Sequence, residues 1–520
     1  MTTAAAANAP SSSSGSRSIR NILSNWGGYF FSILVGFFLS PFVVHRLGNS
    51  AYGVWTLMVS LTGYLGLLDF GVRGSVTRYV ARFHARGEHE SSGRLVSSAL
   101  LIFSCAGALA ILVSCLIAWH GTRLFRIPVE YQGQARIVFL LAGLSVAGAL
   151  LGGVFGGILV GLHRFDLTNL IEITTSAIRA VATVAALLLG KGIITLALIQ
   201  VACSLGANYT RAVMSWRLYP ELKIHFRLAD KRSLLLIWYF GISSFMLHVF
   251  STIILYTDSV VIASALPIEF VTFFSIGGNL FTYARGLLSG ITQTVTPLAS
   301  KLEGEGELDK LRALVLKAFC YATTLMLPVY LTFLLRGDAV IGLWMGKEYG
   351  ALSGQILGIL ALAGMFSAAP AIAWATMFGM SKHGPMVPMY LTEAAVNLGL
   401  SIWWVHIFGI AGVAWGTTLP NLLVSALFWP WYMHRTLKIP ISSFVLQAWI
   451  RPFAAMVPFA LLTRWMALHW PAARLVELFG QILVALPAAA IPAWFLCLRA
   501  DDRHYLISKL LTLRALLKAA

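Results

Sequence analysis

The sequence predicts an all-α, polytopic membrane protein with about fourteen transmembrane helices. Apolar residues make up 58% of the 520-residue chain and charged residues only 11%, whereas soluble proteins carry about 25% charged residues. Apolar segments of about 20 residues, enough to cross about 30 Å of hydrocarbon, recur along the whole chain. A weak internal repeat relates the two halves. We therefore expect two pseudo-symmetric six-helix bundles plus two C-terminal helices.

The stretch 46–82 illustrates how these helices are predicted. Apolar and aromatic residues run almost unbroken from Ala51 to Phe70, and arginines follow at Arg73 and Arg82. This pattern predicts one membrane helix that continues past its apolar part, so that its charged end projects from the bilayer.

Hydropathy predicts fourteen such segments along the chain. They lie near residues 22–44, 51–76, 95–119, 136–161, 168–189, 192–214, 234–263, 268–299, 313–335, 351–379, 385–407, 411–433, 446–468 and 474–498.

The distribution of Lys and Arg predicts the orientation of these segments. One set of alternate loops, which includes both chain termini, holds more than twice as many Lys and Arg residues as the other set. Because cytoplasmic loops collect these residues, both termini are expected in the cytoplasm. The net charge of +18 is accordingly interpreted as a sign of topology and not of nucleic-acid binding.

The internal repeat predicts the domain organisation. An offset of about 219 residues aligns the two halves and brings the helix that carries Arg179 over the helix that carries Asn397. We expect an N-lobe and a C-lobe with the same topology, related by an axis along the membrane normal. The predicted parts are a disordered cytoplasmic tail (1–21), the N-lobe (22–214), a basic cytoplasmic linker (215–233), the C-lobe (234–433), helices thirteen and fourteen (434–498) and an amphipathic cytoplasmic tail (499–520).

Three smaller segments complete the chain. Residues 1–20 contain no apolar run before Arg17, so they are not expected to be a cleavable signal peptide. The alternating run 222–228 predicts a strand-like or interfacial connector in preference to a partner-binding site. The C-terminal tail places four leucines on one helical face, which favours a helix lying on an anionic leaflet. These leucines are Leu506, Leu510, Leu513 and Leu517.

No motif indicates catalysis, a metal or a cofactor. The chain lacks the HExxH, GxSxG and Walker patterns. Its five cysteines lie in apolar segments without metal-ligand spacing and are interpreted as small core residues. They are Cys105, Cys115, Cys203, Cys320 and Cys497.

The candidate functional residues are ionisable groups inside apolar segments. Such a group costs about 2.5 to 3.5 kcal/mol at the bilayer centre. Asp69 and Arg73 are four residues apart and are interpreted as a structural ion pair near the interface, with gating as the functional alternative. The other candidates are Glu172, Arg179, Asp258, Arg285 and Glu393.

Arg179 and Arg285 lie deepest in their segments. Glu172 precedes Arg179 by seven residues on the same helical face, and Asn279 and Tyr283 precede Arg285. Either arginine is a partner in a buried ion pair, or it faces a water-filled cavity and binds an anionic headgroup, because Arg binds phosphate oxygens with two parallel hydrogen bonds.

Asp258 and Glu393 have two interpretations. Each is a candidate for titration with a coupling proton, and each is equally a candidate for a helix-to-helix hydrogen bond.

Four stretches in order carry a resemblance to a known family. They are LGNSAYGVWTLMVSLTGYLGLLDFG followed by VTRYVARFHARGE, then GLHRFDLTNLIEI (161–173), HFRLADKRSLLLIWYFG (225–241) and AAVNLGLSIWWVHIFGIAGVAWGT (394–417). Over roughly helices 1 to 12 the chain resembles the polysaccharide transporter family, the O-antigen and exopolysaccharide lipid flippases of the multidrug/oligosaccharidyl-lipid/polysaccharide (MOP) exporter superfamily.

The resemblance implies a non-enzymatic function in the bacterial inner membrane. The family moves undecaprenyl-diphosphate-linked oligosaccharides from the cytoplasmic to the periplasmic leaflet by alternating access, without a cofactor. It also implies polysaccharide polymerase or export proteins as partners, besides the glycan lipid and the bilayer. The lipid II flippases of the superfamily carry an Arg-Asp pair in their first helix where Leu39 and Ser40 stand here, which disfavours a peptidoglycan role.

Two other classes remain open at this point. A cation or drug antiporter has the same fold, but cavity arginines disfavour cationic substrates. A membrane glycosyltransferase or polymerase usually carries a sizeable periplasmic loop, and this chain has none.

The charge distribution generates a topological prediction. A reporter fused after Ala520 is expected to be active only in the cytoplasm, because an even number of spans returns the chain to the side on which it began. Green fluorescent protein and alkaline phosphatase fusions measure this. A fully active phosphatase at this position would contradict the fourteen-helix count.

Overall fold

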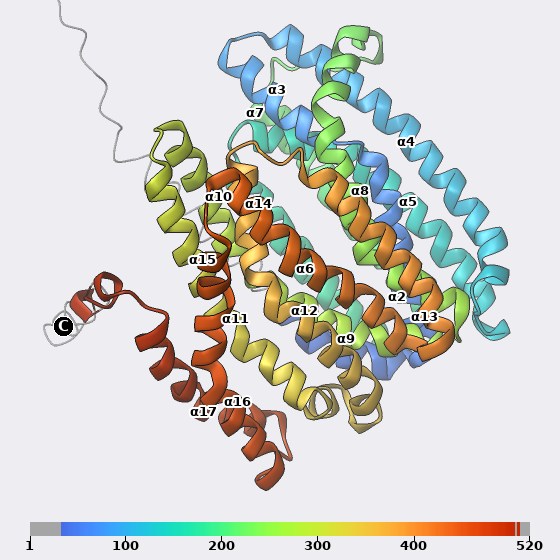
Figure 1. Cartoon of the computed structure of the whole chain (residues 1–520). Coiled ribbons are helices and arrows are strands. Elements are labelled where there is room, and N and C mark those ends of the chain that lie inside the picture. Colours follow the sequence, from blue (N-terminus) through green and yellow to red (C-terminus); the bar gives the residue numbers. More distant parts are fainter. Residues whose placement is uncertain (1–32, 505–506, 510–520) are drawn as a thin grey trace, which may run out of the picture. The chain divides into compact units, whose positions relative to one another are not determined.

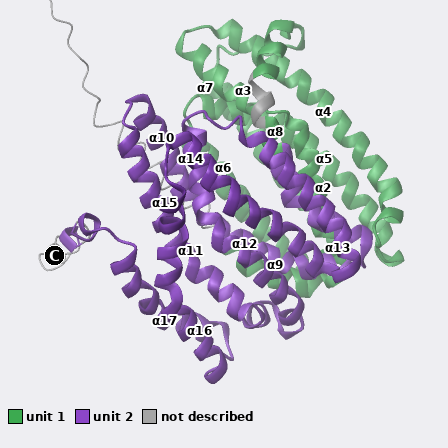
Figure 2. Ribbon diagram, in the orientation of Figure 1, with its two compact units in different colours: residues 1–248 green, residues 249–520 purple. Residues whose placement is uncertain are grey.

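The computed structural model describes residues 33–504 and 507–509, and for residues 240–244 it describes the backbone alone. This described part is built of helices and contains no strand, as Figure 1 shows. The chain divides into two compact units, residues 1–248 and 249–520, coloured separately in Figure 2. The boundary falls within one long helix, α8 (Lys231–Ala265). The predicted lobes with the linker 215–233 between them remain a prediction.

Unit 1 precedes this boundary. Its helices are Ile33–Leu47, α2 (Asn49–Leu65), η1 (Gly66–Asp69), α3 (Val72–Ala85), α4 (His89–Leu124), α5 (Val129–Gly161), α6 (Phe165–Leu188), α7 (Ile193–Leu218) and η2 (Phe226–Leu228).

Unit 2 follows it. Its helices are α9 (Glu269–Gly286), α10 (Ser289–Gly304), α11 (Leu308–Met345), α12 (Lys347–Gly379), α13 (Met386–Leu423), η3 (Val424–Phe428), α14 (Trp429–Leu437), α15 (Ile441–Val445), η4 (Leu446–Ile450), α16 (Arg451–His469) and α17 (Leu475–Leu496).

The structure confirms an all-α, multi-pass membrane protein. Eleven helices in the described part are long and apolar enough to span a membrane. One of these, Met386–Leu437, is a hairpin of two arms, because Gly409 has non-helical angles (φ 60°, ψ −141°) and Asn397 bonds Thr417 across the turn at 2.8 Å. The count of fourteen remains a prediction.

The helix expected at 51–76 is broken. Phe70 and Gly71 both adopt left-handed φ values, 49° and 74°, between η1 and α3. A glycine accepts this conformation without strain, and it permits a sharp turn. The prediction of one continuous helix with a projecting charged end was therefore wrong, since the arginines that follow belong to a separate helix, α3.

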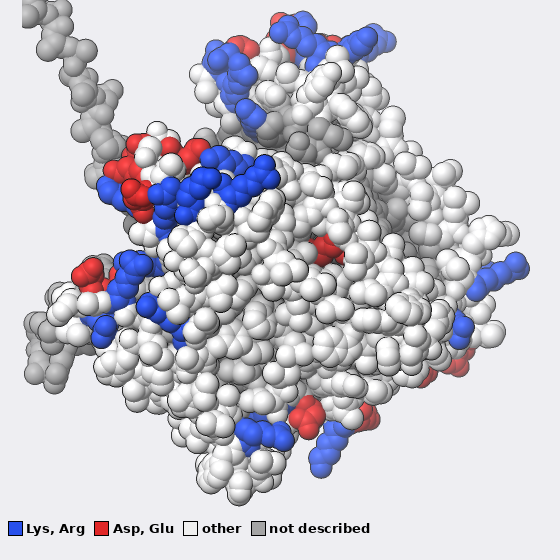
Figure 3. Space-filling model, viewed as in Figure 1, with Lys and Arg blue, Asp and Glu red and all other residues white. Residues whose placement is uncertain are grey.

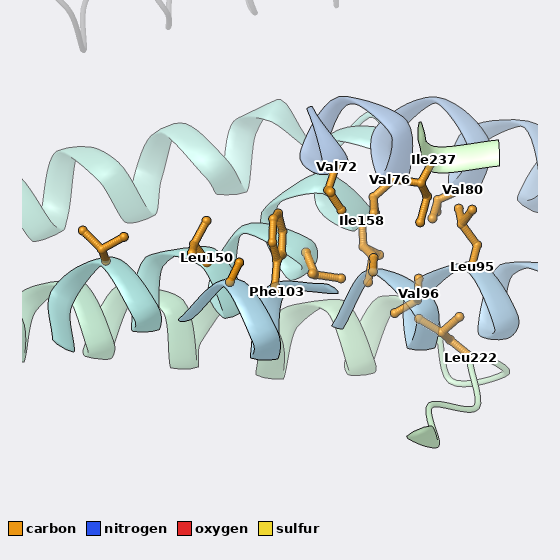
Figure 4. Packing of buried hydrophobic residues seen from close by; sticks show 14 of the residues in the cluster. Val72, Val76, Val80, Leu95, Val96, Phe103, Leu150, Ile158, Leu222 and Ile237 are labelled. Carbon is orange, nitrogen blue, oxygen red and sulfur yellow. The ribbon is translucent and has the colours of Figure 1, made fainter. Parts of the chain in front are cut away.

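The core of unit 1 forms where α3, α4 and α5 meet. Val76, Phe103 and Ile158 come from these three helices and are fully buried. Figure 4 shows such side chains pointing toward one another, with Leu222 and Ile237 from beyond α7 completing the cluster. Because lipid tails are as apolar as these side chains, close van der Waals packing between the helices, and not transfer out of water, stabilises this cluster.

Glycines of α5, in the stretch GALLGGVFGGILVG (148–161), allow close packing. A Cβ on Gly157 would lie 3.2 Å from the carbonyl oxygen of Arg73, and one on Gly161 would lie 2.9 Å from that of Thr77. Both neighbours are backbone atoms of α3, which cannot turn aside. Because glycine has no side chain, the backbones of α3 and α5 can approach each other closely.

The linker 215–233 packs on α4. The backbone N–H of His225 donates to Ser97, and that of Asp230 donates to Ser98. Asp230 then accepts a hydrogen bond from the N–H of Ser233 at the start of α8, and hydrogen bonding to Ser233 lowers the pKa of the Asp230 carboxyl. Of the alternating run 222–228, expected as a strand-like or interfacial connector, only residues 226–228 form a regular element, the short helix η2, and no strand is present.

The chain after α17 is attached to α11. Asp502 accepts a hydrogen bond from Lys317 at 2.9 Å and another from Tyr321 at 2.5 Å. The leucine face predicted for 506–517 and the tail 1–21 lie outside the described residues.

The packing of α5 against α3 generates a stability prediction. Gly161→Val is expected to lower the free energy of unfolding by about 1 to 3 kcal/mol, because the added side chain meets backbone. Gly133→Val is the matched control on the same helix, since nothing lies within 4 Å of its Cβ position. Thermal melting in detergent measures both. Equal midpoints for the two variants would contradict the close approach.

Candidate functional site

Unit 1 contains a cavity of about 400 Å³ at Arg179. The helix Ile33–Leu47 and α6 supply most of its lining, and Trp55 and Leu196 complete it from α2 and α7. The polar lining residues are Glu172, Ser176, Arg179 and Thr183. Two of the candidate residues from the sequence analysis, Arg179 and Glu172, thus line this cavity.

Arg179 is held by neutral groups. Its Nη1 donates to Oε1 of Gln200 on α7 at 2.8 Å, and its Nη2 donates to the Ser176 hydroxyl at 3.5 Å. Among the described residues no carboxylate lies within 4 Å of this guanidinium. The ion-pair alternative for Arg179 is therefore not realised, and its positive charge stays uncompensated at the cavity.

Glu172 pairs elsewhere. Its Oε2 lies 2.7 Å from Nη2 of Arg211 on α7. Arg211 also donates to Oδ1 of Asn208, whose amide donates to the carbonyl of Gly148 on α5. Sequence reasoning missed Arg211, because it lies near the end of a predicted helix. Its spacing of three from Asn208 was the available signal.

Arg285 lies near the end of α9 in unit 2, with an exposed side chain. It interacts electrostatically with Glu393, Tyr390 and Tyr330. Within the described part of the chain it donates no hydrogen bond and has no carboxylate within 4 Å. Asn279 and Tyr283, earlier on α9, are half-buried and each has interaction partners of its own.

Asp258 and Glu393 are buried and hydrogen-bonded to neutral groups. The Thr417 hydroxyl lies 2.9 and 3.0 Å from the two oxygens of Asp258, and the Asn397 amide donates to the same hydroxyl. Glu393 accepts a hydrogen bond from Asn421 at 3.1 Å. The predicted alternative of hydrogen bonds between helices is thus present for both carboxyl groups.

Asp69 and Arg73 form the predicted ion pair. Nε of Arg73 lies 3.5 Å from Oδ2 of Asp69, and the backbone N–H of Arg73 donates to Oδ1. Because α3 begins at Val72, the carboxylate lies at the N-terminus of that helix and stabilises its first turn. A gating role for the pair remains a prediction.

Arg336 follows directly after the predicted segment 313–335, but the helix continues past it. It lies inside α11, only 2% exposed, at a kink where φ is −138°. Its Nη2 donates to Gln481 on α17 at 2.7 Å, and its Nε and Nη1 have no partner among the described residues. This buried arginine links α11 to α17 within unit 2.

The model for the family described as polysaccharide biosynthesis protein matches residues 18–303. The chain belongs to this family.

Relatives and solved structures agree with this family assignment. A protein of Shigella flexneri named "Putative O-antigen transporter" is 23% identical over 435 residues, which cover 81% of this chain and 99% of that protein. The lipid II flippase MurJ, in an inward closed conformation, superposes with a TM-score of 0.72 at 14% identity over 92% of this chain and 98% of MurJ. An inward-facing multidrug resistance MATE transporter superposes with a TM-score of 0.67 at 16% identity, over 80% and 94%.

This member of the polysaccharide biosynthesis protein family therefore has the fold of the MOP superfamily, as its resemblance predicts. The Shigella relative is named as a transporter and MurJ as a flippase, and neither name is that of an enzyme. Figure 3 shows most of the visible charged side chains apart from a broad uncharged surface, within which one acidic patch is seen, and such apolar helix flanks suit a multi-pass membrane protein.

Proposed function

We propose that the protein is a flippase for a lipid-diphosphate-linked oligosaccharide, which it moves from the cytoplasmic to the periplasmic leaflet of the inner membrane by alternating access. The observation that carries this proposal is a pair of intramembrane arginines, Arg179 and Arg285, one in each unit, neither of them compensated by a carboxylate within 4 Å among the described residues. The named relatives support the same function.

An uncompensated guanidinium suits a diphosphate. Placing an arginine in an apolar membrane helix costs about 2.5 to 3.5 kcal/mol of insertion free energy. Side-chain packing alone does not offset this cost. A diphosphate leaving the headgroup region loses water and needs positive charge and N–H donors in its place. Arg supplies both, with paired hydrogen bonds to phosphate oxygens.

The cavity at Arg179 fits part of such a substrate. Its 400 Å³ lies within the usual range for small-ligand sites, about 300 to 1,000 Å³. Ser176 and Thr183 add hydroxyl groups that suit phosphate or sugar oxygens. The prenyl chain stays in lipid throughout, so the protein has to bind only the headgroup.

Asp258 is the candidate for ion coupling. It is 7% exposed and is held by a hydroxyl and not by a cation, so its charge is free to change during a transport cycle. Glu393, bonded to Asn421, is the second candidate. Polysaccharide polymerase or export proteins are the proposed partners of the flippase.

A cation or drug antiporter is the competing function, and the MATE-like fold is compatible with it. The charge at the cavity opposes it, because Arg179 repels a cationic substrate while Glu172 is neutralised by Arg211.

Replacing either arginine tests the proposed headgroup site. Arg179→Gln and Arg285→Gln are each expected to lower glycan export by about tenfold or more, since hydrogen bonds to charged groups contribute about 1.5 to 3 kcal/mol. Lysine at either position is expected to restore part of the export, because it keeps the charge and loses the paired geometry. The measurement is surface glycan per unit of membrane-inserted protein.

Arg464→Gln is the matched control, because Arg464 is exposed near the end of α16. Normal export by both glutamine variants would contradict the headgroup site. So would an export loss that always follows a loss of folded protein.

Ion coupling is tested at Asp258. Asp258→Asn keeps a partner for Thr417 but removes the negative charge, so uptake driven by a proton or sodium gradient is expected to disappear while exchange down a substrate gradient persists. Proteoliposomes measure both modes. Asp309→Asn is the control, because Asp309 is exposed at the start of α11. Retention of gradient-driven uptake would exclude Asp258 as the coupling group.

A further inference from the structure

A second and larger cavity, of about 820 Å³, opens in unit 2 between the two arms of the α13 hairpin. One wall is the start of α13 with the turn before it, and the other wall is η3 with α14. We call this cavity the hairpin groove. Its lining residues are Lys382, Pro385, Pro388, Met389, Thr392, Val424, Phe428, Trp431, Tyr432, Arg435 and Thr436.

The hairpin groove changes in polarity along its length. Lys382, in the turn before α13, and Arg435, in the last turn of α14, supply positive charge at one end. From Pro385 to Thr392 the wall then runs about 10 Å along the helix axis, at 1.5 Å per residue. Met389, Val424 and other apolar residues line this length. The groove therefore joins a cationic mouth to an apolar trough.

The cationic mouth is fixed in place by its neighbours. The Tyr432 hydroxyl donates to the backbone carbonyl of Lys382 at 2.6 Å, which ties the turn before α13 to α14. The Arg435 guanidinium lies 5.5 Å from the centre of the Trp431 ring. Glu303 is the carboxylate nearest Lys382, at 3.9 Å with both side chains partly exposed, and such a contact adds little stability.

The groove also coincides with a local irregularity in its second wall. Residues 424–428, which form η3, are π-helical. Such single turns widen a helix and recur at functional sites. Trp431 and Tyr432 follow directly, and these residue types favour the level of the lipid headgroups.

We propose that the hairpin groove binds an anionic phospholipid. The headgroup phosphate lies between Lys382 and Arg435, and an acyl chain follows Met389 and Val424. Charge complementarity selects the anionic headgroup, and the apolar trough lies in helices that span the membrane, where acyl chains are the molecules that fill it. The site is separate from the proposed substrate cavity at Arg179.

Thermal melting of the full-length protein in neutral detergent tests this proposal. Phosphatidylglycerol is expected to raise the melting midpoint, whereas phosphatidylcholine with the same chains and inorganic phosphate are not. The double variant K382Q/R435Q is expected to weaken the apparent affinity for phosphatidylglycerol by about tenfold or more, given about 1 kcal/mol per cation near an anionic headgroup.

Two further variants separate this site from general charge effects. K347Q/R464Q removes one exposed lysine and one exposed arginine outside the groove and is expected to behave like the wild type. Thr392→Trp fills the trough without changing charge and is expected to lower the affinity as well. If K382Q/R435Q does not fold, the affinity of Thr392→Trp for phosphatidylglycerol tests the groove in its place.

Four results would overturn the proposal. These are an equal effect of phosphatidylcholine, an equal effect of inorganic phosphate, unchanged phosphatidylglycerol binding in both groove variants, and displacement of phosphatidylglycerol by equimolar prenyl diphosphate, which would assign the groove to the substrate. Because the readout is lipid binding and not export, failure of the proposed flippase function leaves this test unaffected.

Discussion

An ionisable side chain in hydrocarbon needs a partner, and this requirement organises the polar interior of the protein. Most such groups are satisfied within the chain, as Glu172 is by Arg211 and Asp258 is by Thr417. Arg179 has only neutral partners, and Arg285 has none within hydrogen-bonding distance among the described residues. Neither guanidinium has a carboxylate within 4 Å among these residues, and we infer that the diphosphate of the proposed substrate supplies the missing negative charge.

Apolar segment length predicted the fold class because it follows directly from the bilayer. A helix that crosses hydrocarbon must be long and apolar, and this requirement is visible in every segment. The break at Phe70 and Gly71 was not visible, because both residues also occur inside helices and only tertiary packing decides the angles. The hairpin at Gly409 agrees with the predicted segments 385–407 and 411–433, which leave a turn between them.

The partners of the site residues were less predictable than the residues themselves. Spacing on one helix favoured a link between Glu172 and Arg179, and both do line one cavity. The ion pair nevertheless forms with Arg211, 39 residues further on. Helix neighbours depend on how α5, α6 and α7 pack, and periodicity along one helix contains no information about that. Arg336 was missed for the same reason, since its partner Gln481 comes from α17.

The α13 hairpin connects the two proposed sites of unit 2. Its arms carry Asn397 and Thr417, which hold Asp258, and a few turns away the same arms form the walls of the hairpin groove. A lipid between the arms changes how closely they approach, and the Asp258 hydrogen bonds require a fixed approach. If both proposals hold, bilayer composition acts on the proposed coupling carboxyl through one bent helix.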